Sequence, residues 1–326
     1  MKYNPRILIP FICCLLFGCS LLPSEMKTAE QLMETNPDSA LHILQHLHPD
    51  ITMNDADRAL YGILYFKALE NNKLSLQPDS LINFSLDYYQ KENNHERLAT
   101  CYFYKGRIYK NAQRYDEATI LYLKALDNLK NKTNYILLGK IYADMGDICS
   151  IQMDYKESRE KYRISIDCFN RAGKKLDACY RVLDIGRSYR LSKDYKTAQK
   201  YYLQALIQSE DSIFLGIVLQ EMGINYYWAK RYDSAQYYLR KSIHFPYKGT
   251  NYSIRYYHLA DLFFDIAQYD SAYRYASIAL KYPANFVTQR ECYRILANTE
   301  YRKGDFKQMA YFMTLFQSCS DSVRKV

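Results

Sequence analysis

Few residues of this sequence have the types and spacing that an active site requires. It contains no glycine-rich phosphate loop, no GxSxG nucleophile elbow and no HExxH motif. His42 and His46 stand four residues apart with His48 close by, so one helix face could offer two imidazoles to a metal ion. No acidic or cysteine partner falls in phase with them. We therefore expect solvated helix histidines, no catalytic residue, no metal site and no cofactor.

The nine cysteines do not form the framework of a disulfide-stapled domain. Three of them precede residue 20, and the other six show no CxxC pair and no tight spacing. Most of the six fall at helical positions that should face inward, where Cys behaves as a small apolar residue. We expect free thiols, with Cys168 and Cys179 as the pair close enough in sequence to check. The six are Cys101, Cys149, Cys168, Cys179, Cys292 and Cys319.

The first residues have the pattern of an export signal. Lys2 and Arg6 precede an apolar run that is too short to cross a bilayer, which needs about 20 apolar residues. The run ends in Leu16-Phe17-Gly18-Cys19, which resembles the lipobox of bacterial lipoproteins, although Phe17 departs from the usual small or aliphatic residue. The resemblance implies cleavage before Cys19, a lipid on Cys19 and stable anchoring to the bilayer. The alternative is an ordinary cleaved signal that happens to precede a cysteine.

Net charge and export narrow the range of partners. The formal net charge is +9, but the basic residues are spread along the chain rather than clustered. Solvated helix faces explain that distribution, and an exported protein rarely meets nucleic acid, so we expect no nucleic-acid partner. We expect a chain held by lipid to the bacterial cell envelope and facing the periplasm, with the choice between inner and outer membrane left open.

One pattern of small and aromatic residues recurs along the chain. Counted from Gly106, small or aromatic residues stand at offsets 0, +3, +9, +12, +16 and +19, namely Gly106, Tyr109, Tyr115, Ala118, Tyr122 and Ala125. The pattern returns, with some substitutions, from Gly146, Gly186, Gly223, Ala260 and Ala297. A single amphipathic helix would not hold this phase over five intervals. We expect pairs of helices, with Ala118, Ala198, Ala235 and Ala272 nearly fully buried where helices cross.

This repeat resembles the tetratricopeptide (TPR) unit of about 34 residues, which has a small residue and an aromatic on its first helix and Ala twice on its second. The resemblance covers residues 26–316 and implies an all-α, TPR-type α-solenoid of about seven helical hairpins. We expect a lone half-repeat or cap over residues 26–50 and one divergent hairpin over 55–91. The organisation is then a lipoprotein signal peptide at 1–18, a lipid-anchored tether at 19–25, a divergent cap and hairpin at 26–91, a TPR array at 95–316 and a tail at 317–326.

Residues 29–44, AEQLMETNPDSALHIL, look like the opening of the periplasmic TPR portion of bacterial membrane sensor-regulators. Those proteins continue into a transmembrane helix and an output domain, so we expect a stand-alone or truncated relative. The expected function is a non-catalytic scaffold or sensor that binds an unidentified envelope protein or peptide. Two alternatives stay open: a carbohydrate-capturing lipoprotein of the starch-utilisation type and an envelope assembly factor.

The TPR resemblance also selects a binding surface. In TPR proteins the concave groove is lined by first-helix positions at offsets −3, +1, +4 and +5 from the leading small residue. Arg and aromatic residues at such positions are common anchors of interfaces. We expect a groove that is basic in its first half and aromatic and mixed in its second, which suits an extended peptide with acidic and apolar stretches. The residues selected are Phe103, Arg107, Lys110, Arg187, Arg190, Gln220, Ile224, Tyr227, Trp228, Tyr257, Phe264, Arg294, Tyr301 and Arg302.

Overall fold

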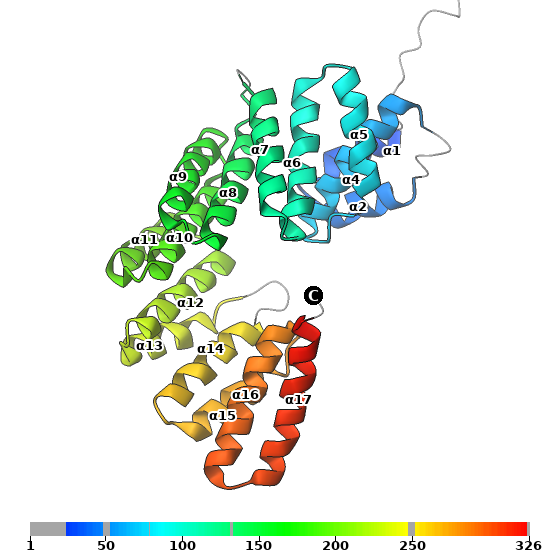
Figure 1. Cartoon of the computed structure of the whole chain (residues 1–326). Coiled ribbons are helices and arrows are strands. Elements are labelled where there is room, and N and C mark those ends of the chain that lie inside the picture. Colours follow the sequence, from blue (N-terminus) through cyan, green and yellow to red (C-terminus); the bar gives the residue numbers. More distant parts are fainter. Residues whose placement is uncertain (1–23, 48–52, 78, 131–132, 247–251, 325–326) are drawn as a thin grey trace, which may run out of the picture. The chain divides into compact units, whose positions relative to one another are not determined.

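The computed structural model describes residues 24–47, 53–77, 79–130, 133–246 and 252–324. Every regular element in these ranges is an α-helix (Figure 1). No helix among them is both long and apolar enough to cross a membrane. The proposed signal peptide and Cys19 lie outside the described residues.

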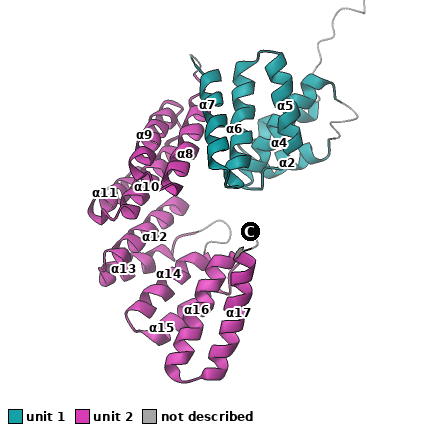
Figure 2. Cartoon of the chain, viewed as in Figure 1, with its two compact units in different colours: residues 1–132 teal, residues 133–326 magenta. Residues whose placement is uncertain are grey.

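The described helices form two compact units, coloured separately in Figure 2. Unit 1 spans residues 1–132 and unit 2 spans residues 133–326. The helices of unit 1 are α1 (Ser24–Leu32), α2 (Pro37–Gln45), α4 (Asp55–Asn71), α5 (Asp79–Lys91), α6 (His95–Asn111) and α7 (Tyr115–Asn128). Those of unit 2 are α8 (Tyr135–Ile151), α9 (Tyr155–Arg171), α10 (Lys175–Leu191), α11 (Tyr195–Gln208), α12 (Ser212–Trp228), α13 (Tyr232–Ser242), α14 (Tyr252–Asp265), α15 (Tyr269–Ala279), α16 (Phe286–Lys303) and α17 (Phe306–Arg324).

Consecutive helices pair into hairpins, and the turns of these hairpins share one backbone conformation. Seven first helices, from α4 to α16, are each followed by a residue with positive φ, although only Gly304 among these seven is a glycine. At the α10–α11 turn Lys193 has φ 65°, and the next N–H, of Asp194, donates to the Tyr189 carbonyl at 2.9 Å. This bond satisfies a carbonyl that the end of a helix leaves without a partner.

The small residues of the repeat let the two helices of a hairpin touch. Ala118, Ala198, Ala235 and Ala272 are fully buried, as the repeat predicted. Gly186 on α10 lies against the ring of Tyr202 on α11, where an added Cβ would stand 2.5 Å from Cε1. Gly106 and Gly146 meet the tyrosine sixteen residues later in the same way, at 2.5 and 2.6 Å. The residues at offsets 0 and +16 therefore contact each other across the hairpin. This contact confirms the register of the repeat.

The two ends of the helical region differ from expectation. In the region expected to hold a lone half-repeat or cap, the described residues form two short helices, α1 and α2, which pair with each other. The described residues therefore hold eight hairpins where we expected about seven. At the other end α17 continues to Arg324, so most of the expected tail is helical, and Cys319 is buried. Ser24 and Glu25, assigned to the tether, already belong to α1.

The six described cysteines are free thiols, and five of them are buried. Burial raises the pKa of the Cys292 thiol to about 12, so this thiol stays protonated near neutral pH. The rings of His42 and His46 lie 4.2 Å apart on α2, but no cluster of potential metal ligands occurs among the described residues.

Candidate interaction surface

From α10 to α16 the first helices of unit 2 form a continuous row. Together with α8, whose Asp147 lies 3.9 Å from Arg181 of α10, we call them the first-helix face (α8, α10, α12, α14 and α16). α12 contacts both α10 and α14, and α14 contacts α16. Second helices of successive hairpins make no contacts of similar extent within the described residues. A stack that is tighter on one side curves toward that side. The first-helix face is therefore the inner face of unit 2.

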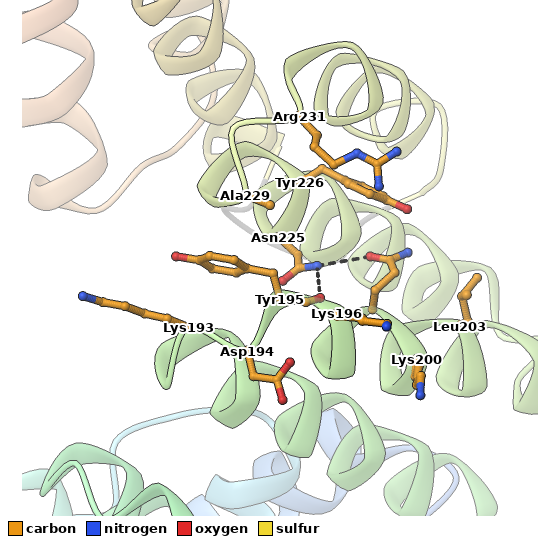
Figure 3. Close-up of a pocket in the computed structure, with 11 residues that line it drawn as sticks. Lys193, Asp194, Tyr195, Lys196, Lys200, Leu203, Asn225, Tyr226, Ala229 and Arg231 are labelled. Atoms are coloured by element: carbon orange, nitrogen blue, oxygen red, sulfur yellow. Dashed lines mark hydrogen bonds between the residues drawn. The ribbon is translucent and has the colours of Figure 1, made fainter.

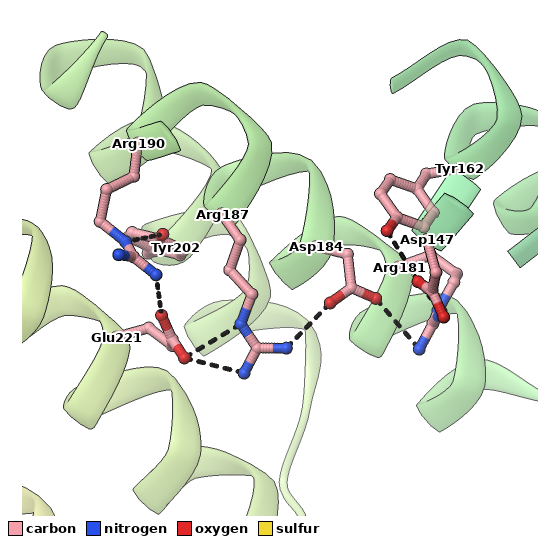
Figure 4. A network of polar contacts seen from close by, with 8 residues as sticks. All are labelled: Asp147, Tyr162, Arg181, Asp184, Arg187, Arg190, Tyr202 and Glu221. Atoms are coloured by element: carbon pink, nitrogen blue, oxygen red, sulfur yellow. Dashed lines mark hydrogen bonds and ion pairs between the residues drawn. The ribbon is translucent and has the colours of Figure 1, made fainter. Parts of the chain in front are cut away.

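An ion-pair network crosses the first-helix face from α10 to α12 (Figure 4). Glu221 on α12 accepts from Arg187 Nη2 at 2.8 Å and from Arg190 Nη2 at 3.0 Å. Arg187 Nη1 also pairs with Asp184 at 2.9 Å. The guanidinium of Arg181 lies 3.0 Å from the other oxygen of Asp184. Both arginines predicted for the first half of the groove therefore hold neighbouring carboxylates of the same protein.

The network extends to α8 and α9, and its charges balance. Arg181 Nη1 lies 3.9 Å from Asp147 on α8, whose carboxylate accepts from the Tyr162 hydroxyl at 2.8 Å. Three guanidinium groups thus face three carboxylates, those of Asp147, Asp184 and Glu221. We expected a basic first half of the groove, and that expectation is wrong for unit 2. The acidic partners come from other turns and other helices.

Burial makes this network electrostatically strong. Burial alone would raise the pKa of Glu221, but Arg187 and Arg190 outweigh it and lower the pKa to about 2. Burial of Asp184 raises its pKa, and the two flanking arginines oppose the change only in part. On α14, burial and the nearby positive charge of Arg190 lower the pKa of His258 to about 4, against the opposing effect of Glu221. His258 is therefore a neutral imidazole at neutral pH.

A second set of polar contacts joins α12, α14 and α16. The Tyr227 hydroxyl donates to the carboxylates of Asp265 and Asp261 on α14, the latter at 3.4 Å. Asp261 also pairs with Arg294 on α16 at 3.0 Å, and Arg294 pairs with Glu291 at 2.7 Å. These contacts fix the orientation of two further predicted groove residues, Tyr227 and Arg294, relative to α14.

Three residues that the repeat offsets selected for the groove are buried instead. Phe103 is 1% exposed in unit 1, with its ring 6.2 Å from that of Tyr122. Ile224 belongs to the apolar core of the last hairpins. Gln220 is also buried. These side chains turn toward helices of their own unit, so offsets −3 and +1 do not always point to the open face.

The remaining residues predicted for the groove are partly or largely exposed to solvent. In unit 1, Lys110 is half-buried, and Arg107 pairs with Glu70 at 2.5 Å, as Arg187 pairs with Glu221 in unit 2. Trp228 and Tyr301 are 57% and 56% exposed, at the ends of α12 and α16. Tyr257 and Phe264 are half-buried against the core, and Arg302 is exposed with its guanidinium 5.8 Å from the ring of Tyr269. Binding at these positions stays a prediction.

No family model matches the chain, and no curated protein matches it in sequence. A Rap protein complexed with competence and sporulation factor matches with a TM-score of 0.61 at 12% identity, over 93% of this chain and 98% of the other. A tetratricopeptide repeat protein from Parabacteroides merdae matches with a TM-score of 0.56 at 14% identity, over 80% and 93%. The fold is that of tetratricopeptide-repeat proteins.

A third structure agrees with this TPR fold. A signal transduction ATPase with a tetratricopeptide repeat sensor, from Pyrococcus horikoshii, has a TM-score of 0.64 at 15% identity, over 93% of this chain and 48% of the other. Sequence identities this low support a shared fold, but they do not support a shared function.

Sequence reasoning missed the carboxylates of this TPR face. Aligned on the leading glycine, three of them share offset −2: Asp144, Asp184 and Glu221. All three are buried in the structure. Two of them, Asp184 and Glu221, hold Arg187 and Arg190, so this shared offset was a usable signal for acidic partners of the groove arginines.

Proposed function

We propose that this TPR chain is a non-catalytic scaffold or sensor module that binds a peptide or protein segment on the first-helix face of unit 2. The observation that carries the proposal is the pair of exposed aromatics, Trp228 and Tyr301, at the ends of α12 and α16. Tyr301 stands at the same offset, +4, as Tyr227, whose hydroxyl is held by Asp261 and Asp265 of the next first helix. Exposed aromatics beside fixed charges are typical of interface anchors.

The polar contacts of the face support this proposal physically. Side chains already held by ion pairs lose little conformational entropy when a ligand binds, which favours affinity. The solved Rap protein, which shares this fold at low identity, was crystallised with competence and sporulation factor. A bound partner is thus compatible with a fold of this kind.

We further propose that a lipid on Cys19 holds the chain to the cell envelope, with the helical region facing the periplasm. The support is the signal-like start and the Leu16-Phe17-Gly18-Cys19 sequence. Replacing Cys19 with Ala should leave the chain uncleaved or release it to the soluble fraction, as judged by fractionation and mass. A processed Cys19→Ala protein that still fractionates with membranes would contradict the anchor.

The binding proposal is tested by copurification from the envelope of the native cell. The double variant Trp228→Ala plus Tyr301→Ala should weaken partner recovery by at least about tenfold, since aromatic anchors often contribute 2 kcal/mol or more. The control is Tyr237→Ala plus Tyr311→Ala, which removes two aromatics that are each 58% exposed on second helices. Equal recovery with both double variants would reject the first-helix face as the binding surface.

A further inference from the structure

A hollow of about 660 Å³ lies away from the first-helix face, between α11 and the end of α12 (Figure 3). Its walls come from the α10–α11 turn, the first half of α11 and the α12–α13 turn. Tyr195 and Tyr226 supply aromatic surface, and Leu203 supplies aliphatic surface. The hollow thus lies where one second helix meets the following hairpin.

The preceding pair of hairpins fills the equivalent position with an arginine. There Arg159 on α9 reaches α10, with its guanidinium carbon 4.3 Å from the centre of the Tyr189 ring and Nη1 3.3 Å from Ser188 Oγ. In the repeat register, Gln199 stands in place of Arg159 and Asn225 in place of Ser188. The Tyr226 ring is faced instead by Arg231, whose guanidinium carbon lies 5.1 Å from the ring centre, and the shorter Gln199 side chain lies along the wall of the hollow.

Two buried amide atoms at this hollow have no hydrogen-bond partner. Asn225, 1% exposed, donates from Nδ2 to the Tyr195 carbonyl at 3.0 Å and to Gln199 Oε1 at 3.3 Å. Its Oδ1 atom and the Nε2 atom of Gln199 remain without a partner. Such atoms are rare in folded proteins because leaving them unbonded is costly. Together they offer one acceptor and one donor, the pair that a peptide N–H and C=O would satisfy.

The rim of the hollow carries unpaired positive charge. Lys193, Lys196, Lys200 and Arg231 line it, and none of the four makes an ion pair with a described residue. The single acidic neighbour, Asp194, caps α11 by accepting from the Thr197 N–H at 3.0 Å. This differs from the first-helix face, where Arg187, Arg190 and Arg294 are already held by carboxylates. Four cations against one carboxylate favour an anionic ligand.

We propose that this hollow binds an acidic segment of a peptide or protein partner. Carboxylates of the segment would meet the lysines of the rim, an apolar side chain would pack on Leu203 and Tyr195, and the segment's backbone would bond to Asn225 and Gln199. The inference rests on the proposed function, because it assigns the acidic part of a partner to a second surface outside the first-helix face.

The test is fluorescence anisotropy with the full chain in detergent and a short labelled peptide that alternates Glu with Ser around a central Leu. The matched probe has Gln in place of Glu, and inorganic phosphate serves as competitor. The Glu peptide should bind and the Gln peptide should not. Lys196→Gln plus Lys200→Gln should weaken binding by about tenfold or more, while the control with the same charge change, Lys281→Gln plus Lys307→Gln, should bind within about twofold of the native protein.

The decisive variant is Gln199→Arg, which restores the arginine found one hairpin earlier. It adds positive charge, so unspecific attraction would strengthen binding, whereas the proposal predicts a loss of about tenfold or more because the hollow is filled. Unchanged or tighter binding by Gln199→Arg would overturn the inference, as would equal affinities of the two lysine double variants. Displacement of the peptide by millimolar phosphate would also overturn it, by indicating a site for small anions.

The two proposals can fail separately. If the Glu peptide does not bind and partner recovery still depends on Trp228 and Tyr301, the hollow is rejected and the first-helix face survives. If the peptide binds in the predicted manner and recovery does not depend on those aromatics, the first-helix face is rejected and the hollow survives.

Discussion

Arg187 Nη2 lies 2.8 Å from Oε1 of Glu221, and the two side chains join the first helices of neighbouring hairpins. The side chain of Glu221 is 8% exposed, so the pair is shielded from water on the acidic side. A charge in this position is tolerated only while its partners remain. Arg187 thus holds two hairpins together before any ligand arrives.

Replacing Arg187 with Ala should therefore destabilise unit 2. Removing one member of a fully buried pair costs about 3–5 kcal/mol. The loss here should be smaller, about 1–3 kcal/mol, because the Arg187 side chain is 36% exposed and Glu221 keeps Arg190. Adding Glu221→Gln should recover part of that loss, which a double-mutant cycle in urea unfolding would measure. The control is Arg171→Ala, which breaks an exposed pair with Asp167 and should cost less than about 1 kcal/mol. Equal losses for the two single variants would contradict the structural role of Arg187.

Stability should fall on acidification, first through His258 and then, at lower pH, through Glu221. The folded pKa of His258 is about 4, against about 6.5 when unfolded, so only the unfolded state gains this proton between those values. The free energy of unfolding should drop by about 1–3 kcal/mol as the pH falls from 6.5 to 4. The pKa of Glu221 is about 2, so its stabilisation is lost at lower pH, between about 4.5 and 2.

Urea unfolding at pH 7 and pH 4.5 tests the histidine window. His258→Gln should remove most of the difference in unfolding free energy between the two pH values. The control His244→Gln changes an exposed histidine and should keep that difference. A native pH dependence in the His258→Gln protein would mean that other groups cause it.

A third prediction concerns the close packing of α11 and its effect on the free energy of unfolding. Ala198 is fully buried, so a Leu side chain there would overpack the contact and cost about 1–3 kcal/mol. Gln204 lies exposed on the same helix, and Gln204→Leu should change the unfolding free energy by no more than about 0.5 kcal/mol. A melting temperature for Ala198→Leu equal to that of Gln204→Leu would contradict the register of the repeat.

Sequence spacing was sufficient to predict the hairpin register. The glycine at offset 0 and the tyrosine at +16 meet in three hairpins, and a buried alanine stands at +12 in four. These positions are constrained by close helix contacts, and such contacts tolerate few residue types. The α1–α2 hairpin was missed because its helices have nine residues each, too short to hold the whole pattern.

The charges of the groove could not be read from one helix at a time. Arg187 and Arg190 look like free cations on α10, and their partner Glu221 stands more than thirty residues later. The hollow beside Gln199 was missed for a related reason. Its lining includes Gln199 and Asn225, which stand in place of Arg159 and Ser188, and that exchange is visible only when repeats are compared position by position. Turn residues such as Met153 and Lys193 gave no signal, because they adopt positive φ without being glycine.

Photo-cross-linking in the native cell tests the central claim most directly. A photoreactive phenylalanine analogue would replace Trp228 or Tyr301 on first helices and, as matched controls, Tyr237 or Tyr311. The two controls stand at one shared offset, +14, on second helices, and each is 58% exposed. We expect the same protein adduct from positions 228 and 301 and none from 237 and 311. Adducts from the second-helix positions alone would contradict binding on the first-helix face.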